Sequence, residues 1–416
     1  MSKTKLCAGL SALSVSLCLS GHVSADNAKL LELLRQNGTI TQQQYDRLKA
    51  KDEKQEVAEQ DMINALKAEH ETANNDYADS FWSKIEPFAD FRFRYDYQHF
   101  NRSPLIGGDP PDRNRVRIRA RFGFQYELND NMLIGFGLAS GGEDPISANQ
   151  TLTDTFSRKP LDLDLAFAQH TFFDDKLAAW LGKFENPYFQ VSPLIFDVDL
   201  RFEGAALQGV APLNSSTNVF ANAGGYVLDE FEDSPRDAYM LGGQAGAEVG
   251  SEDVGKVTGA VGYYNFEDTG EIDETEFTSN TENKFDGVIN PNVSVEFYDL
   301  GGLYVSLYGD YVNNTSADTD ETGWLAGVLL GKEEIENLGD WQIGGTYRRL
   351  EANASFDEFP ESDFRSGGTN VKGWTTGYEI GLGSGFSQRT TFFDASQVDG
   401  PTAGERRVQV DLLYKF

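Results

Sequence analysis

Residues 113–128 alternate strictly between charged or polar and apolar side chains. Their odd positions begin with five arginines, and apolar or aromatic side chains fill the even positions from Val116 to Leu128. A period of two is typical of a β-strand, and this run is about twice the usual length of a strand in a soluble protein. A one-residue slip would turn the arginines toward lipid, at roughly 2–4 kcal/mol each near the bilayer midplane. The pattern therefore predicts a strand with one wet side and one lipid-facing side.

The same alternation recurs throughout residues 85–416. Strand-like runs begin near residues 85, 113, 132, 161, 177, 198, 218, 238, 256, 287, 302, 322, 341, 371, 386 and 407. Short turns, such as 129–131 and 173–176, alternate with longer polar loops, such as 98–112, 141–159, 267–286 and 352–369. An even number of strands with short turns at one end and long loops at the other is typical of an outer-membrane barrel. We therefore predict an all-β fold, a transmembrane antiparallel β-barrel of about 16 strands over residues 85–416, with both termini at the short-turn, periplasmic end.

Residues 1–25 have the features of a secretory signal peptide. Lys3 and Lys5 precede an apolar stretch over residues 6–19, and Val23-Ser24-Ala25 is a small-residue cleavage site. We predict cleavage after Ala25. Both cysteines, Cys7 and Cys18, fall in the removed segment, so the mature chain is predicted to have no disulfide, thiol nucleophile or cysteine metal site.

Residues 26–84 are predicted to form a separate periplasmic helical arm. Asn37-Gly38 is a helix stop, and Thr41 with Gln44 fits a capping box that starts a second helix. Helical spacing is visible in Leu30, Leu31 and Leu34. The apolar seam is thin, so an isolated helix would be marginal. Self-association as a coiled coil and a solvated linker are equal alternatives here.

Charge and hydropathy exclude two classes of function. The formal net charge of −31 argues against a nucleic-acid partner, because phosphate binding needs a basic surface. Mean hydropathy is −0.44, and beyond the N-terminus no run approaches 18 apolar residues, which excludes a helical membrane bundle.

Inward-facing charges of the predicted barrel would line a pore. We expect these pore-lining residues to be Asp90, Arg92, Arg94, Asp96, Arg113, Arg115, Arg117, Arg119, Arg121, Asp162, Asp164, Lys183, Glu185, Arg201 and Arg348. The arginines form a ladder on the first two strands. The ladder could create a transverse field or a track for anions. Alternatively, it could pair with acids of the wall and keep the lumen wet and stable. Both interpretations stay open, and both could hold.

Several smaller features refine this prediction. The apolar segment 186–196 is expected to pack against either the lumen wall or a neighbouring subunit. We favour the wall, where it would form a constriction loop with Tyr188 or Phe189 near the arginine ladder. Four tryptophans are assigned to lipid-facing girdles, and Pro291 fits poorly inside a strand. The girdle residues are Trp180, Trp324, Trp341 and Trp374. Inward glycines are expected to leave room for a pore, namely Gly135, Gly137, Gly242, Gly246, Gly327 and Gly344.

The order of segments along the chain resembles the putative porin family of Gram-negative outer membranes, and more distantly the phosphate-selective porins. The resemblance rests on LLELLRQNGTITQQQYDRL (30–48), NRVRIRARFGFQYEL (114–128), LIGFGLASGG (133–142), LGKFENPY (181–188), DVDLRFEGAALQ (197–208), GDYVNN (309–314), SDFRSGGTNVKGW (362–374) and QVDLLYKF (409–416). It implies a sixteen-stranded, trimeric channel in the outer membrane for passive diffusion of small hydrophilic solutes and ions. Phosphate specificity is not expected, because the barrel is poor in lysine.

Partners and rival functions follow from the same residues. The last strand ends on Tyr414 and Phe416, similar to the recognition signal of the barrel-assembly machinery. Outer-membrane lipid and lipopolysaccharide are the other expected partners, with divalent ions bridging acidic loops to lipopolysaccharide or, alternatively, loops that are simply solvated. An enzymatic barrel and a structural or adhesive barrel are the alternatives. His70, His99 and His170 have no evident catalytic partner, and no metal or phosphate-loop motif appears, so we predict no enzyme activity, no cofactor and no metal.

Overall fold

The computed structural model describes residues 23–78, 81–103, 107–232, 236–251, 254–269, 272, 279–401 and 403–415. The chain divides into two units, one ending at Ser83 and the other beginning at Lys84. Residues 1–22 and Phe416 lie outside the described residues. Signal cleavage after Ala25 and the role of Phe416 in assembly therefore stay predictions.

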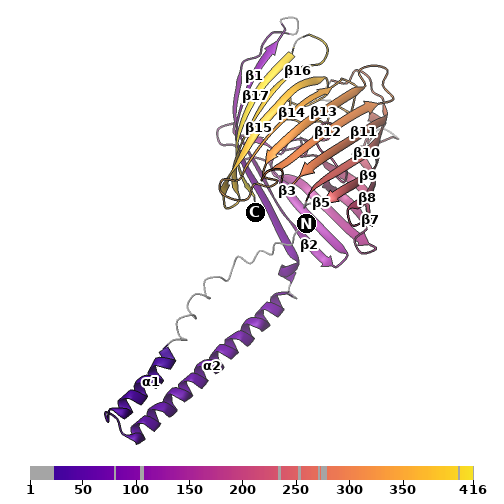
Figure 1. The fold of residues 1–416 in the computed structure, drawn as a ribbon. Coiled ribbons are helices and arrows are strands. Elements are labelled where there is room, and N and C mark those ends of the chain that lie inside the picture. Colours follow the sequence, from indigo (N-terminus) through magenta and orange to yellow (C-terminus); the bar gives the residue numbers. More distant parts are fainter. Residues whose placement is uncertain are drawn as a thin grey trace. The chain divides into compact units, whose positions relative to one another are not determined.

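The first unit contains a hairpin of two helices, α1 (Val23–Gln36) and α2 (Gln42–Ala78) (Figure 1). The predicted stop and restart are confirmed. Gly38 ends α1 with a φ of +66°, a value that glycine adopts without strain. The Thr41 backbone N–H donates to Gln44 Oε1 at 2.9 Å, and the Gln44 N–H donates to Thr41 Oγ1 at 3.3 Å, which is a reciprocal capping box. Among the described residues, neither helix is both long enough and apolar enough to cross a bilayer.

A short 3-10 turn, η1 (Phe81–Lys84), spans the boundary between the two units. The second unit then continues as a sheet that closes on itself (Figure 1). The described residues form sixteen long antiparallel strands, and β1 pairs with both β2 and β17. The long strands are β1 (Ile85–Arg102), β2 (Arg113–Asn129), β3 (Met132–Ala139), β5 (Asp162–Phe172), β6 (Leu177–Glu185), β7 (Arg201–Asn214), β8 (Thr217–Asp229), β9 (Ala238–Ser251), β10 (Gly255–Glu267), β11 (Phe285–Phe297), β12 (Tyr304–Asn314), β13 (Thr322–Gly331), β14 (Trp341–Leu350), β15 (Val371–Gly383), β16 (Phe386–Gln397) and β17 (Ala403–Lys415). The two-residue β4 (Gln150–Thr151) pairs with β2 beyond the end of β3.

The predicted barrel is confirmed, with its strand number and order. Most predicted strand starts fall within two residues of the observed ones. The largest differences are at β7, which begins at Arg201 instead of near residue 198, and at β17, which begins at Ala403 instead of near residue 407. Side-chain exposure follows the period of two: on β1, Phe93 is 41% exposed and the adjacent Arg94 is 3% exposed. Apolar side chains therefore cover the outside, and charged ones turn inward.

Pro291 lies inside β11, where it has no N–H to donate to β12. The registered pairs between β11 and β12 stop after Ile289 and resume at Asn292. The side chain of Asn290 compensates, because its Nδ2 donates to the Tyr311 carbonyl at 2.8 Å. A proline is tolerated in this strand because the neighbouring residue replaces the missing hydrogen bond.

Three connections fold into the barrel, and they are residues 140–149, 186–200 and 351–370. The segment between β6 and β7 reaches β12 through Ser192, whose Oγ donates to Asp310 Oδ2 at 2.7 Å. The segment between β14 and β15 reaches β1 and β17 through Asp363. The contact of Ser192 with Asp310 passes through the barrel interior, because β7 and β12 are five strands apart around the wall. The buried apolar core forms where the last two segments meet the inner wall.

Candidate functional site

Seven inward-facing arginines gather where β1 lies between β2 and β17, and we call them the lumen arginine cluster. Its members are Arg92, Arg94, Arg115, Arg117, Arg119, Arg121 and Arg407. The strand register sets Arg94 directly opposite Arg117, and Arg92 opposite Arg119. Like charges in such positions destabilise a sheet unless carboxylates separate them.

Three carboxylates of the barrel wall pair with the cluster. Asp411 accepts from Arg94 Nε at 2.7 Å and Nη2 at 2.9 Å, and Asp96 binds Arg407 with the same fork geometry at 2.7 and 2.9 Å. Asp96 also accepts from Arg115 at 2.5 Å. Asp90 pairs with Arg119 at 2.8 Å. These contacts are the cross-strand pairs that the second interpretation of the ladder describes.

The infolded segments supply two more carboxylates and one carbonyl. Asp363 pairs with Arg94 at 2.7 Å and with Arg407 at 3.2 Å. Asp199 pairs with Arg121 at 2.7 Å and with Arg119 at 3.4 Å. The third segment contributes Asn149, whose carbonyl accepts from Arg117 Nη2 at 3.0 Å. The arginines therefore anchor all three segments inside the barrel.

The surrounding charge shifts the pKa values of the carboxylates on the infolded segments. Burial alone would raise the pKa of Asp199, but the guanidiniums of Arg121 and Arg119 lower it below its usual value. Burial acts likewise on Asp363, and its arginine partners hold its pKa well below the usual value. No cation of the described residues lies within ion-pair distance of Asp197. Burial and the charge of Asp199 raise its pKa well above the usual value.

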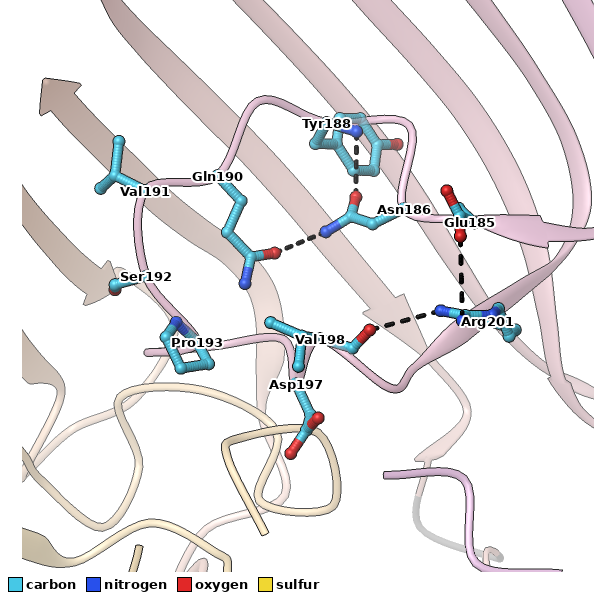
Figure 2. Close-up of a pocket in the computed structure, with 10 residues that line it drawn as sticks. All are labelled: Glu185, Asn186, Tyr188, Gln190, Val191, Ser192, Pro193, Asp197, Val198 and Arg201. Carbon is cyan, nitrogen blue, oxygen red and sulfur yellow. Dashed lines mark hydrogen bonds and ion pairs between the residues drawn. The ribbon is translucent and has the colours of Figure 1, made fainter. Parts of the chain in front are cut away.

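The segment 186–200, with Glu185 and Arg201 of the flanking strands, lines an open pocket of about 370 Å³, shown in Figure 2. Asn186 holds its turn, because Asn186 Oδ1 accepts from the Tyr188 N–H at 2.9 Å and its Nδ2 donates to Gln190 Oε1 at 2.6 Å (Figure 2). The Tyr188 hydroxyl accepts from Tyr226 at 3.0 Å, and its ring meets that of Tyr264 edge-on at 5.1 Å.

Tyr188 and Phe189 were expected near the arginine ladder, and the structure places them elsewhere. Tyr188 lies against β8 and β10, and the backbone of Phe189 exchanges two hydrogen bonds with Gln244 of β9, at 2.8 and 2.9 Å. The opposite end of the same segment reaches the arginines through Asp199. The aromatic part of the segment packs against the aromatic part of the wall, and its carboxylate pairs with the arginines.

On β6, the sequence assigns three side chains to the wrong face. Phe184 is buried in the interior core, and Trp180 packs with it at 5.8 Å. Trp180 therefore faces inward instead of toward lipid. Lys183, on the opposite phase, faces outward and pairs with Glu203. Glu185 shares this outward phase, and its side chain is 73% exposed. The physical reason is that segment 186–200 fills the adjacent lumen with aromatic rings, so the wall there is apolar on its inner side.

The remaining expected pore residues lie apart from the cluster. Asp164 and Arg201 pair with each other at 3.4 Å, and Asp162 is exposed at the start of β5. Arg113 is exposed at the start of β2. Arg348 pairs with Glu361 and lies under the Phe364 ring at 4.3 Å, so it holds segment 351–370 from β14, the strand that precedes the segment.

The inward glycines do not leave empty space. A Cβ at Gly135 would meet the Phe167 ring at 2.2 Å, one at Gly242 would meet the Tyr188 hydroxyl at 2.2 Å, and one at Gly327 would meet the Tyr308 ring at 2.3 Å. Aromatic rings lie directly over these backbones. The expectation that such glycines widen the pore is wrong, because they accommodate large neighbours.

Sequence reasoning missed Asp363 and Asn149 as partners of the arginines. Both lie in connections that were interpreted as polar external loops. A signal for the first was present in the three phenylalanines of segment 351–370, because exposed loops rarely carry such a cluster. Phe356 and Phe364 are buried, and Phe359 packs against the core. Within the described part of the chain, no group of His, Asp and Glu side chains is arranged to hold a metal ion.

Comparison with known proteins agrees with this geometry. The sequence profile of a family described as "Putative porin" matches residues 95–315 and 290–416. OprB of Pseudomonas putida, in its high-pH structure, is 11% identical with a TM-score of 0.54, over 82% of this chain and 97% of that one. The outer membrane channel DcaP of Acinetobacter baumannii is 13% identical with a TM-score of 0.47, over 80% and 97%. At this identity, the likeness to OprB shows the fold alone. No curated protein sequence matches the chain.

Proposed function

The chain belongs to the putative porin family and forms an outer-membrane channel of the Gram-negative type, and we propose that its lumen arginine cluster makes the channel favour anions. The observation that carries this proposal is an imbalance of charge. Seven guanidiniums of the cluster have five carboxylates within ion-pair distance, which are Asp90, Asp96, Asp199, Asp363 and Asp411.

An uncompensated positive charge acts strongly in a channel. Fixed charges along a narrow path with low-dielectric walls concentrate counter-ions far more than the same charges on an open surface. Selectivity in pores follows from such lining charges and from the pore radius. The acidic external loops act earlier on the path, where water and salt screen their charge.

Different arginines of the cluster support the two interpretations of the ladder. Arg94, Arg119, Arg121 and Arg407 support the structural interpretation, because they hold Asp199 and Asp363 of the infolded segments. The excess charge supports the functional one. We propose that anchoring and selectivity are combined in this one cluster.

The reversal potential of the purified protein in a planar bilayer tests this proposal. In a tenfold KCl gradient, the reversal potential of wild type should have the same sign as the chloride equilibrium potential. Joint replacement of Arg117, Arg119 and Arg121 by Ala should shift that potential toward cations. A cation-selective wild type, or a triple variant with an unchanged potential, would overturn the proposal.

The family and the fold are those of a channel, not of an enzyme, and we propose that the protein has no catalytic activity. We also propose a homotrimer, with residues 26–84 as a periplasmic coiled coil. Exposed apolar side chains on the two helices support self-association, among them Leu33, Val57 and Met62. Native mass spectrometry of the full chain and of a deletion of residues 26–80 tests both points, with a trimer expected for the first and a less stable trimer for the second.

We further propose maturation after Ala25 and recognition of the last strand by the barrel-assembly machinery. The Tyr414 ring packs against Phe386 of the preceding strand, with ring centroids 4.4 Å apart, so one of the two aromatics of the proposed signal lies on an ordered strand. N-terminal sequencing of the membrane-extracted protein should begin at Asp26. Replacement of Tyr414 and Phe416 by Ala should lower the amount of protein in the outer membrane.

A further inference from the structure

The excess charge of the lumen arginine cluster is confined to two of its seven members. In the described part of the chain, Arg117 is the member without a carboxylate within ion-pair distance. Arg92 has one at 3.9 Å, Asp411, but that carboxylate already binds Arg94 with both oxygens. The wall therefore leaves the charges of Arg92 and Arg117 uncompensated.

Both guanidiniums converge on a single residue, Asn149 of the infolded segment 140–149. Arg117 Nη2 donates to the Asn149 carbonyl at 3.0 Å, and Arg92 Nη1 lies 3.5 Å from Asn149 Oδ1. These acceptors are neutral dipoles, which orient the guanidiniums without neutralising them. The two positive groups are thus held side by side by one loop residue and not by an anion of the protein.

Each of the two arginines also keeps a buried donor that has no acceptor. The Nε atoms of Arg92 and Arg117 are both buried and make no hydrogen bond. Arg115 and Arg121 have partnerless Nε atoms as well, but each of them has a carboxylate on another nitrogen. A buried, unsatisfied donor on an uncompensated cation is costly, and an anionic acceptor relieves both costs at once.

We propose that Arg92, Arg117 and Asn149 form a binding site for an oxyanion group, a carboxylate or a phosphate, on a solute that passes through the channel. This inference rests on the proposed function and names its substrate class. A guanidinium offers parallel N–H donors that match two oxygens of an oxyanion, whereas a spherical chloride ion takes no such fork. Arg117 is partly exposed, so a solute in the lumen reaches it.

A binding site on the conduction path makes the current saturate. In wild type, conductance in potassium acetate should level off as concentration rises, whereas conductance in potassium chloride should rise more nearly in proportion. Arg117→Gln should increase the half-saturating acetate concentration about tenfold, the effect of losing one hydrogen-bonded ion pair. Arg117→Lys, which keeps the charge and loses the fork, should fall between the two. Potassium phosphate as a second salt distinguishes a carboxylate site from a phosphate site by which of the two saturates at lower concentration.

Lys256→Gln is the matched control. Lys256 lies on the inward phase of β10, eight strands from β1 around the barrel, and pairs with Glu248 and Glu296, so this change lowers the lumen charge by the same amount at a distant place. It should leave the acetate saturation unchanged. Equal effects of the two variants would show that net charge, and not this site, is responsible, and would overturn the inference.

The site and the proposed function fail in different ways. Acetate conductance that stays linear in wild type, in a channel that still favours chloride over potassium, would overturn the site and leave the anion channel standing. Saturation that depends on Arg117 in a cation-selective channel would overturn the proposed anion preference and leave the site standing. A protein that inserts into the bilayer without conducting would overturn both.

Discussion

Arg94 Nη1 and Asp363 Oδ2 lie 2.7 Å apart, although 269 residues separate them in the sequence. Arg94 belongs to the first strand of the barrel, and Asp363 to a segment that enters the lumen from the connection between β14 and β15. The same carboxylate also reaches Arg407 of β17 at 3.2 Å. This contact anchors segment 351–370 in the same cluster that contains the two uncompensated arginines, Arg92 and Arg117.

Asp363→Asn should release segment 351–370 from the wall. Removal of one partner from a buried ion pair costs about 3–5 kcal/mol, because it leaves the other charge uncompensated. We expect a lower midpoint of thermal unfolding in detergent, followed by the loss of β-sheet circular dichroism. We also expect a larger single-channel conductance with more current noise. Asp394→Asn is the control, since Asp394 and Arg406 form an exposed pair at 3.7 Å, and it should change neither quantity. Equal behaviour of both variants would show that Asp363 is not an anchor.

Asp199 and Asp197 should respond to pH with opposite signs. The pKa of Asp199 is lowered in the folded chain, so its contribution to stability is present above its usual value of 3.8 and is lost as pH falls below it. The pKa of Asp197 is raised, so its contribution is present at low pH and is lost as pH rises from 3.8 through the raised value. Thermal unfolding between pH 3 and pH 8 should therefore show a smaller acid-side decline in Asp199→Asn and a smaller high-pH decline in Asp197→Asn than in wild type. Identical pH profiles for the two variants would contradict these assignments.

Asn290→Ala should destabilise the barrel at Pro291. The change leaves the Tyr311 carbonyl without its donor and also removes the 2.6 Å bond from Asn290 to Asp310. An unsatisfied buried acceptor costs about 1–3 kcal/mol. Adding Pro291→Ala restores a backbone N–H at this position and should recover part of the loss. A double variant no more stable than the single one, in heat-dependent migration on gels, would refute the compensation.

Gly242→Ala should displace segment 186–200. The new methyl group would lie 2.2 Å from the Tyr188 hydroxyl and 2.8 Å from its ring. Tyr188 must then move, and residues 186–200 with it, which should change the unit conductance. Gly243→Ala, at a neighbouring position where the new methyl group would lie 4.0 Å from the Asn222 carbonyl oxygen, should leave the conductance unchanged. The contact is unimportant if the Gly242 variant also conducts like wild type.

The alternation of side chains was sufficient to predict the barrel, because hydrocarbon on one side and polar groups on the other impose a strict period of two. It failed at β6, where Trp180 and Lys183 exchange their expected faces. That strand is short, and the side it turns inward is decided by the aromatic segment folded against it, which lies outside the strand itself. Local pattern carries no information about a distant loop.

The same distinction, between residues on strands and residues on connections, applies to the candidate site. The arginines of β1 and β2 could be placed from the sequence, since each strand fixes the phase of its own residues. Their partners Asp363 and Asn149 could not be placed from the sequence. A polar connection can remain in external water or enter the lumen, and the outcome depends on whether the lumen offers it ion-pair and hydrogen-bond partners. The excess charge of Arg92 and Arg117 emerges once those partners are known.

Lipid contact along β2 tests the central claim most directly. With both natural cysteines, Cys7 and Cys18, replaced by serine, single cysteines at Phe122 and Phe124 and at Arg121 and Gln125 can carry a fluorophore in the reconstituted protein. Brominated lipids should quench the first two labels strongly and the last two weakly, while a water-soluble quencher should do the reverse. Quenching that shows no dependence on odd or even position would contradict a barrel with its arginines in the lumen.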